Sequence, residues 1–513
     1  MQLVAYGAQD IYLTGSPQIT FFKVVYRRHT NFSLESIEQT FNGSVNFGNK
    51  VTCTVSRNGD LLTKAYLKVT LPSLMSNDVK QGDAVASHPS GGAALHGWCD
   101  GVGHKLIKYV EVEIGGQRID KHYGEWLQIW NELTQTAGHA LGYNRMTGQH
   151  PMFQLPATKA VAAVGGDRFV VPEQTMYIPM QFWFNRNPGL ALPLIALQYH
   201  EVKFNFEFET LDNLIPTYTP LPYQLTDALG GPETWTFRTE VIGQLQASLY
   251  VDYVYLDADE RKRFAQVTHE YLIEQLQFTG AESIPSNATN HKAKLNFNHP
   301  VKELIWTVKP AGSTGGYHKM RPFNWSLPAL GPNQRPEDAT TPAQDDLDIV
   351  SISGMGAMAG AGGDWRALTS LQYNRRNPVK AGILQLNGHD RFSKRDGDYF
   401  NLVQPYQHHE NVPVTGVNVY SFALKPEEHQ PSGSCNMSRI DNAVLNLEFE
   451  KLEEGGNISV YATNYNVLRV LSGMGGLAYA SIITDSSVIM DIAGIGSKLV
   501  SMLFTGFAHS FGR

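Results

Sequence analysis

The sequence predicts an all-β protein with two related halves, and three observations lead to this prediction. Apolar and polar residues alternate along many short segments, glycine and proline are frequent, and the same short motifs return in the same order along the chain. Of 513 residues, 47 are Gly and 26 are Pro, and 11% are aromatic. This composition favours many short strands joined by turns.

The strands are predicted from period-two alternation. Apolar Val202, Phe204, Phe206 and Phe208 are interleaved with polar residues, which is typical of a strand with one buried face. The same alternation recurs over 249–255, 304–308 and 445–449. Strands are therefore expected throughout the chain.

Turn signals indicate that the strands are mostly antiparallel. Asn58 with Gly59, and Gly115 with Gly116, each separate two β-rich runs, and such pairs accept the positive φ of hairpin turns. Helical spacing is rare. One short helix is predicted from the spacing of Trp126, Ile129, Trp130 and Leu133. The sequence has no βαβα rhythm, so a doubly wound fold is not expected.

Four pairs of motifs indicate an internal duplication. The paired segments, in chain order, are 37–39 with 273–275, 64–72 with 302–310, 112–116 with 384–388, and 205–211 with 446–452. Each match alone could be chance. Two copies of about 240 residues, each with some eight strand candidates, fit a β-sandwich or jelly roll better than a propeller.

The junction between the halves is placed near the charged run Asp257 to Arg263, interpreted as a solvated linker or helix turn and not as a nucleic-acid patch. Long irregular stretches at 142–172, 280–298 and 310–348 are rich in Gly, Pro, Asn and Thr. We expect them to be surface loops.

Composition also limits the class of protein. Hydrophobic residues make up 42% and charged residues 17%, so the chain can fold, and its net charge of −7 argues against direct nucleic-acid binding. Three dispersed cysteines, Cys53, Cys99 and Cys435, favour a reducing compartment. Neither a secretory signal pattern nor a spanning apolar segment is visible, so synthesis as a soluble cytosolic protein is expected.

No metal site is predicted. His96, Cys99, Asp100 and His104 form a tight cluster of ligand types, but a second ligand pair is missing. His408, His409 and Glu410 lack the order of a helical metal motif. Both groups are interpreted as polar loops.

No enzyme and no cofactor are predicted either. The glycine-rich run Ser351 to Trp365 resembles a phosphate-binding loop, but its spacing is wrong and no Lys and Ser/Thr pair follows. A G-x-S-x-G elbow is absent from the sequence. We therefore predict a non-catalytic protein without catalytic, cofactor-binding or metal-ligating residues.

The sequence contains motifs for N-linked glycosylation. Six Asn-x-Ser/Thr sequons occur, at Asn31, Asn42, Asn287, Asn324, Asn436 and Asn457. Without a signal peptide we expect them to be unused. Asn287 and Asn324 lie in predicted loops and are the better acceptors if a non-secretory route exists.

The last segment, 482–513, is predicted to be an amphipathic helix with glycine interruptions. Apolar residues recur there at helical spacing, namely Ile489, Ile492, Leu499, Leu503 and Phe507. Docking on its own or a neighbouring subunit is favoured over lying in a membrane interface or remaining mobile.

Long segments of the chain resemble a known family. The opening GAQDIYLTGSPQITFFKVVYRRHTNF (7–32) is similar to the start of the major capsid proteins of nucleocytoplasmic large DNA viruses, such as the chlorella virus and iridovirus proteins. Further similar segments are 182–206, 250–265, 299–306, 438–447 and 465–481. The resemblance thus reaches from residue 7 to residue 481.

The resemblance implies two tandem eight-stranded antiparallel jelly rolls with a few short helices. The implied division is an N-terminal arm (1–30), jelly roll 1 (31–256), jelly roll 2 (257–481) and the tail (482–513). It implies a homotrimer that forms a pseudo-hexagonal capsomer, and neighbouring capsomers that tile an icosahedral shell. Minor capsid and penton proteins, and an internal viral membrane, are expected on the inner side, with synthesis in the host cytoplasm.

One departure concerns the tail. Chains of the family commonly stop soon after the segment that matches GGLAYAS, whereas this one continues for about thirty residues. The alternative to the capsid function is a jelly-roll carbohydrate-binding protein or a minor virion surface protein. Jelly rolls host unrelated functions, so the fold by itself does not separate these possibilities.

Overall fold

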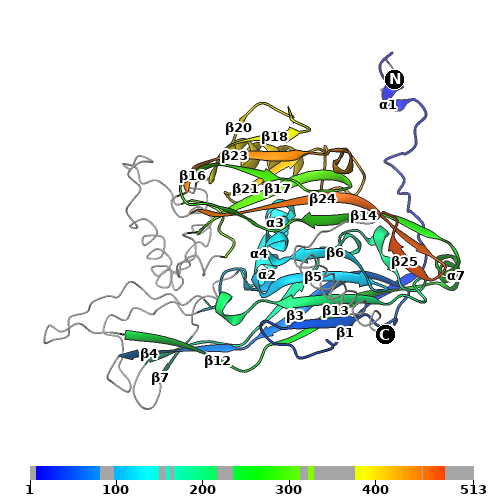
Figure 1. The fold of residues 1–513 in the computed structure, drawn as a ribbon. Helices are drawn as coiled ribbons and strands as arrows, with labels where there is room; N and C mark the ends of the chain where they lie inside the picture. Colours follow the sequence, from blue (N-terminus) through cyan, green and yellow to red (C-terminus); the bar gives the residue numbers. More distant parts are fainter. Residues whose placement is uncertain are drawn as a thin grey trace, which may run out of the picture.

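The computed structural model describes residues 7–80, 97–149, 158–161, 167–215, 235–311, 322–327, 376–452 and 455–479. Antiparallel sheets dominate it, and they fall into two similar units (Figure 1). Among the described residues, no helix is long and apolar enough to cross a bilayer.

The first unit is a sandwich of two sheets. One sheet has the order β1-β13-β3, with β9 and the short β10 both paired to β3, and the other has the order β2-β11-β5-β6. Alternate residues of both sheets meet in one core that includes Leu67, Val251 and Phe204. The strands are β1 (Phe32–Gln39), β2 (Lys50–Thr54), β3 (Leu61–Leu71), β5 (Ile107–Ile114), β6 (Gln117–Tyr123), β9 (Gln174–Pro179), β10 (Leu192–Pro193), β11 (Val202–Phe208) and β13 (Gln246–Leu256).

The second unit repeats this arrangement. Its sheets have the orders β14-β24-β17-β21 and β16-β23-β18-β19, with the short strands β15 and β25 on β24, β22 on β17, and β20 on β18. The strands are β14 (His269–Phe278), β15 (Glu282–Ile284), β16 (Ala288–Lys294), β17 (Pro300–Pro310), β18 (Val379–Leu386), β19 (His389–Asp390), β20 (Arg395–Asp396), β21 (Val417–Ser421), β22 (Cys435–Asn436), β23 (Ala443–Leu452), β24 (Gly456–Leu471) and β25 (Met474–Leu477).

Both units have jelly-roll topology. Numbered in chain order, the eight main strands of each unit pair as 1-8-3-6 in one sheet and 2-7-4-5 in the other. This confirms the predicted double jelly roll. Each of the four repeated motif pairs lies on strands with the same place in this order: β1 with β14, β3 with β17, β5 with β18, and β11 with β23.

One motif pair repeats the strand but not the residue register. Aligned letter by letter, Leu67 of β3 matches Ile305 of β17. Leu67 lies in the first core, whereas Ile305 faces the outside of its barrel and joins a separate cluster. A shift of one residue turns a strand side chain to the other face of its sheet, so sequence similarity alone misassigns this face.

Of the two predicted hairpins, one is confirmed and the other is wrong. Gly115 and Gly116, with φ of 58° and 86°, connect the paired strands β5 and β6, as predicted. Asn58 and Gly59 connect β2 with β3, which belong to different sheets. There the ring of Tyr253 packs on Gly59, where a Cβ would lie 2.6 Å from the Tyr253 Cβ, so close packing accounts for this glycine.

Two of the expected loops contain regular structure. The stretch 142–172 includes the end of α4 (Ala137–Thr147), β7 (Thr158–Val161) and β8 (Asp167–Val171). The stretch 280–298 includes β15 and β16, and β16 pairs with β23. β16 lies at the edge of its sheet and has a single buried residue, so it lacks the apolar alternation from which a strand is predicted. Most of 310–348 lies outside the described residues.

A fifth sheet extends the first unit. Its order is β12-β4-β8-β7, with β4 at Ser73–Lys80 and β12 at Trp235–Ile242. It projects from the left end of the molecule (Figure 1).

Short helices occupy the connections. Between β6 and β9 lie α3 (Gly124–Thr134) and α4, and α3 is the helix predicted from its tryptophan spacing. The charged run at the junction forms α7 (Ala258–Gln266), capped by the Asp257 side chain. The remaining helices are α1 (Ile11–Thr14), α2 (Val102–Leu106), α6 (Trp183–Arg186), η1 (Pro188–Leu190), η2 (Leu211–Asn213), the π-helix η5 (Tyr399–Val403), α11 (Gln404–His408) and η6 (Met437–Arg439).

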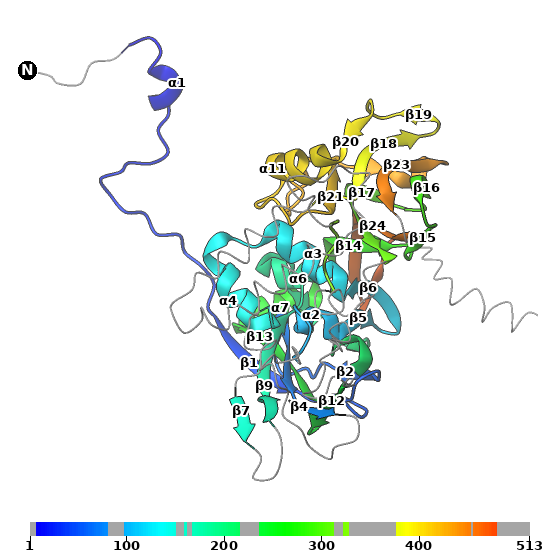
Figure 2. The same cartoon turned by 90° about the vertical axis from the view of Figure 1, so that its left-hand side faces the viewer.

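The four barrel sheets stack as layers. In Figure 1 the order from top to bottom is β16-β23-β18, then β14-β24-β17, then β5-β6, then β1-β13-β3, with α3 between the two units, and Figure 2 also shows the second unit above the first. Residues 7–31 carry α1 and run away from this stack. Almost all of them are exposed, including Phe21 and Phe22.

Candidate functional site

The seam between the two barrels is the most elaborate feature of the described chain. Helix α3 belongs to the first unit, and it packs on the outer face of the sheet β14-β24-β17-β21 of the second. Its apolar stripe consists of Trp126, Ile129, Trp130 and Leu133. It contacts a matching set on the second unit, namely Leu276, Ile305, Trp325, Val417, Val419 and Tyr461.

A carboxylate in the first turn of α3 adds directional contacts across the seam. One oxygen of Glu125, Oε1, accepts a hydrogen bond of 2.8 Å from Trp325 Nε1 and one of 3.4 Å from Thr307 Oγ1. The other, Oε2, accepts a hydrogen bond of 3.2 Å from the Tyr461 hydroxyl. Burial and the adjacent carboxylate raise the pKa of Tyr461 well above its usual value, so this hydroxyl stays a donor.

Buried charges pair across the same seam. Arg186 of α6 lies 2.9 Å from the Glu274 carboxylate of β14, and Lys302 of β17 lies 2.9 Å from the same oxygen. The Lys302 side chain is fully buried, and burial lowers its pKa. Its ammonium group also donates to the Pro426 carbonyl at 2.6 Å. A charge buried this deeply depends on its partners, so these contacts fix the position of β14 relative to the first unit.

His409 is the centre of a second buried ionic group. Its Nε2 lies 2.9 Å from Glu303 and its Nδ1 lies 2.8 Å from Glu427. Burial alone would lower the pKa of this imidazole, but the charge of Glu303, its hydrogen bond and those of Glu427 raise it to about 9. The His408, His409 and Glu410 cluster is therefore part of an ionic network. Sequence inspection missed both glutamates, because neither lies next to His409 in the chain.

Backbone contacts join the units at two further places. The Leu276 N–H donates to Asp120 Oδ1 at 3.1 Å, and the Gln275 side-chain Nε2 donates to the Ile119 carbonyl. The Tyr199 N–H donates to the Gly473 carbonyl at 3.0 Å. The seam is thus apolar around α3 and hydrogen-bonded on either side of it.

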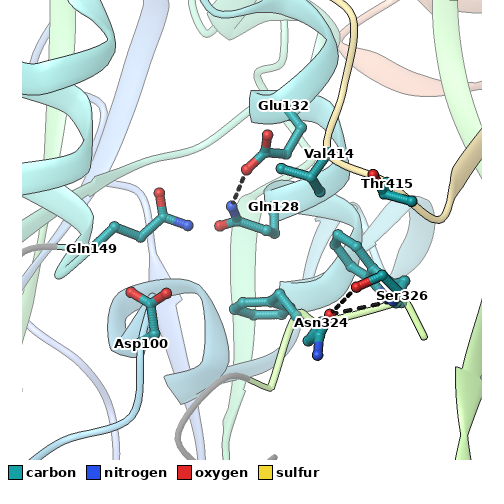
Figure 3. A pocket seen from close by; sticks show the side chains of 10 residues that line it. Asp100, Gln128, Glu132, Gln149, Asn324, Ser326, Val414 and Thr415 are labelled. Carbon is teal, nitrogen blue, oxygen red and sulfur yellow. Dashed lines mark hydrogen bonds between the residues drawn. The ribbon is translucent and has the colours of Figure 1, made fainter. Parts of the chain in front are cut away.

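A pocket opens at the seam between α3, the segment 323–326 and the segment 414–415 (Figure 3). Glu132 lines it and accepts a hydrogen bond of 3.0 Å from Gln128 Nε2. Burial raises the pKa of Glu132 to about 7. The lining residues are Asp100, Gln128, Glu132, Gln149, Phe323, Asn324, Trp325, Ser326, Val414 and Thr415.

Behind the pocket, His104 is a buried neutral histidine. Burial lowers its pKa to about 4. Its Nδ1 donates to Gln128 Oε1 at 2.7 Å, which leaves Nε2 to accept from the Tyr143 hydroxyl at 3.0 Å. Both nitrogens are thus used within the protein.

The described members of the sequence cluster around His104, namely Cys99, Asp100 and His104, do not form a metal centre. Asp100 lines the pocket, Cys99 is buried, and burial raises the pKa of the Cys99 thiol to about 12. His96 lies outside the described residues. Across the described part of the chain, no group of three or more His, Cys, Asp or Glu side chains could hold a metal ion. The three cysteines are free thiols.

The two preferred sequons lie in different surroundings. Asn287 is exposed in the turn between β15 and β16, with φ of 58°. Asn324 lines the pocket, its Oδ1 accepts from Ser326, and its Nδ2, the atom that would carry a glycan, is buried. The glycine-rich run 351–365 and the tail 482–513 lie outside the described residues.

Comparisons with known proteins cover nearly the whole chain. The family model described as "Major capsid protein N-terminus" matches residues 20–257, and "Large eukaryotic DNA virus major capsid protein" matches residues 260–476. The major capsid protein of Pyramimonas orientalis virus is 50% identical, over 94% of this chain and 99% of its own length. That of Paramecium bursaria Chlorella virus 1 is 41% identical, with the same coverage.

Solved structures show the same fold. The chain is similar to the capsid protein in the quasi-atomic model of the PBCV-1 virus capsid, with 36% identity, a TM-score of 0.63, and coverage of 90% of this chain and 100% of that one. The Faustovirus major capsid protein has a TM-score of 0.64 at 12% identity, covering 91% of this chain and 94% of its own. This second similarity concerns the fold alone.

Proposed function

Because this chain belongs to the family of large eukaryotic DNA virus major capsid proteins, we propose that three copies form a pseudo-hexagonal capsomer and that capsomers tile an icosahedral shell. The protein is a structural component of the virion capsid, not an enzyme, and it associates with further copies of itself. The trimer and its tiling are the proposed part.

The observation that carries the proposal is the repeated barrel. Two barrels with the same strand order stack in the same direction within one chain, so three chains supply six similar units. Six similar units in a ring approximate a hexagon, and a hexagon can tile a flat facet through repeated side contacts. The seam supports this role, since its apolar and ionic contacts make the two barrels one rigid building block.

The proposed division of the chain remains an arm (1–30), jelly roll 1 (31–256), jelly roll 2 (257–481) and a tail (482–513). It is supported by the position of α7 between the two sandwiches and by family matches that meet between residues 257 and 260.

We further propose that the arm contacts minor capsid proteins, penton proteins or an internal viral membrane on the inner side of the shell. The support is its exposed apolar side chains, Phe22 among them at 98% exposed. Direct nucleic-acid binding is not proposed, given the net charge of −7. Synthesis in the host cytoplasm is consistent with three free cysteines.

The tail is proposed to make contacts between subunits or on the inner face. A chain truncated after Ser481 should then give less stable trimers or particles. Truncated chains that assemble equally stable trimers and particles would contradict this role.

For glycosylation, Asn287 is the proposed acceptor in preference to Asn324. The buried Nδ2 of Asn324 is out of reach in the folded protein, while Asn287 is exposed. Peptide mass spectrometry of the protein from virions tests this order. A glycan on Asn324 with none on Asn287 would overturn it.

The trimer is tested by light scattering after size exclusion of the recombinant protein. A chain of 56.9 kDa predicts a trimer of roughly 171 kDa, three times that mass. A monomer at micromolar concentration would contradict spontaneous trimer formation by this chain.

A further inference from the structure

We propose that the helical segment η5–α11 of one copy packs on the outer face of the sheet β1-β13-β3-β9 of the next copy. The first surface, called here the donor face, consists of Leu402, Val403, Tyr406 and Leu424. The second, the acceptor face, consists of Phe32, Leu34, Tyr66, Tyr177 and Tyr250. The inference rests on the trimer proposed above and names the side chains through which it forms.

The chain contains a precedent for this contact. Helix α3 lies in the connection from β6 to β9, the fifth and sixth main strands of the first barrel. It packs on the outer face of the second barrel's sheet β14-β24-β17-β21. The matching connection of the second barrel runs from β19 to β21 and contains β20, η5 and α11. By the internal repeat, η5–α11 should cover the same type of sheet on the next barrel.

Among the residues that the structure describes, few cover the outer face of that next sheet. In the second barrel, β17 is buried along nearly its whole length, because α3 covers one face and the core the other. In the first barrel, buried and more accessible residues alternate along β3, and β1 is exposed along most of its length. Only the end of this face, at Val254 and Leu256, packs against Phe264 of α7.

The acceptor face has the composition of an interface. Tyr66 stacks on Tyr250 with 5.6 Å between ring centroids and lies 6.4 Å from Tyr177. The Tyr66 hydroxyl pairs with Ser36 at 2.8 Å, which places the tyrosines on the same face as Leu34 and Phe32 of β1. Leu34 is 63% exposed. Tyrosine and phenylalanine are enriched in protein interfaces because they bury a large area and keep a polar or rigid edge.

The donor face is apolar, exposed and held in place. Tyr406 is 79% exposed and Leu424 is 72% exposed, and Leu402 and Val403 lie on the same helical turn as Tyr406. Beneath them Phe400 packs on Trp306 of the barrel core. His408 Nδ1 donates to the Leu424 carbonyl at 2.9 Å, which joins the two parts of the face. An exposed apolar patch on such a rigid support is typical of a binding surface.

The stacking order makes the contact head-to-tail. With the barrels in one direction, the sheet β1-β13-β3 forms one end of the stack (Figure 1), and α11 lies beside the other end, at the level of β20 (Figure 2). Donor and acceptor faces are different surfaces, so the contact is heterologous, and a constant rotation between copies closes it into a ring.

The test compares solution masses of single variants of the full chain. Tyr406→Asp on the donor face and Leu34→Asp on the acceptor face should each raise the trimer dissociation constant by roughly 30-fold or more, the effect of losing a central interface residue. Tyr199→Asp is the matched control, since Tyr199 is 75% exposed and lies on neither face. Unchanged circular dichroism and melting temperature verify that each variant is folded.

Crosslinking provides an independent readout. In a Cys435→Ser chain, cysteines at Tyr406 and Leu34 should give covalent trimers with a short bismaleimide, while cysteines at Tyr199 and Leu34 should not. Cys53 and Cys99 are buried and do not compete.

The outcomes separate the two proposals. A trimeric wild type with dissociating Tyr406→Asp and Leu34→Asp variants supports the interface. If the wild type is trimeric, both aspartate variants stay trimeric and the double-cysteine chain does not crosslink, this interface is overturned and the trimer stands. A wild type that is monomeric overturns both.

Discussion

Arg186 of the first jelly roll and Glu274 of the second form an ion pair of 2.9 Å across the seam between the barrels. The same guanidinium group lies 4.7 Å from the ring centroid of Trp130, a residue of α3. One side chain therefore ties the ionic part of the seam to its apolar part. The two barrels are joined by contacts made far from the α7 connection as well as by the chain itself.

Removing an aromatic anchor of α3 should loosen the seam. Trp126→Ala is expected to cost about 3–5 kcal/mol, since Trp126 is buried against Tyr461, with 5.5 Å between ring centroids. Urea denaturation followed by tryptophan fluorescence measures the shift. Leu141→Ala, at an exposed site on α4, should change stability by less than about 0.5 kcal/mol. Equal midpoints for the two variants would show that α3 does not hold the barrels together.

Removing the shared carboxylate should leave a fully buried cation, Lys302, and a partly accessible one, Arg186, without their common partner. Glu274→Ala is expected to cost about 3–5 kcal/mol, because Lys302 and Arg186 lose their common partner. The control is Glu428→Ala, which breaks the exposed pair Lys425 and Glu428 and should cost at most about 1 kcal/mol. Melting temperatures of both variants provide the comparison. A double variant Glu274→Ala, Lys302→Met should recover part of the loss.

His409 should make stability fall in the alkaline range. Its pKa is about 9 in the folded protein against 6.5 without its partners, so the folded state holds the proton more tightly. The contribution is complete below pH 6.5 and disappears as the pH rises through 9. The melting temperature of the wild type should therefore fall between pH 7 and pH 10. His409→Gln should have a lower melting temperature at pH 7 and a flatter profile. Parallel profiles would contradict the pairing with Glu303.

Glu132 should make the stability of the folded protein depend on pH in a range closer to pH 7. Burial raises its pKa from 4.5 to about 7, so the folded state binds a proton that the unfolded chain has already released in this range. Stability should decline as the pH rises from 4.5 through 7. Glu132→Gln keeps the hydrogen-bonding shape without a charge, and its stability relative to the wild type should increase from pH 5 to pH 8. A constant difference between the two would mean that Glu132 is not protonated in the folded protein.

Local sequence patterns predicted the elements well. Alternation identified β11 and β23, the Gly115 and Gly116 pair identified the β5–β6 hairpin, and tryptophan spacing identified α3. These features depend on residues that are neighbours along the chain, so a short window contains their cause. The repeated motifs likewise revealed two similar units, because the same strand requires the same alternation wherever it occurs.

The tertiary structure decided which surfaces meet. Asn58 and Gly59 looked like a hairpin turn, yet β2 and β3 take partners from other parts of the chain and lie in separate sheets. Alternation placed Leu304 and Trp306 on the core face of β17, but it gave no sign that Ile305 on the opposite face is buried as well, under α3. Glu303 and Glu427 gave no sign of their pairing with His409. Period, turn chemistry and composition determine a strand and its two faces, but burial of a face depends on a partner distant in sequence, and only packing supplies that partner.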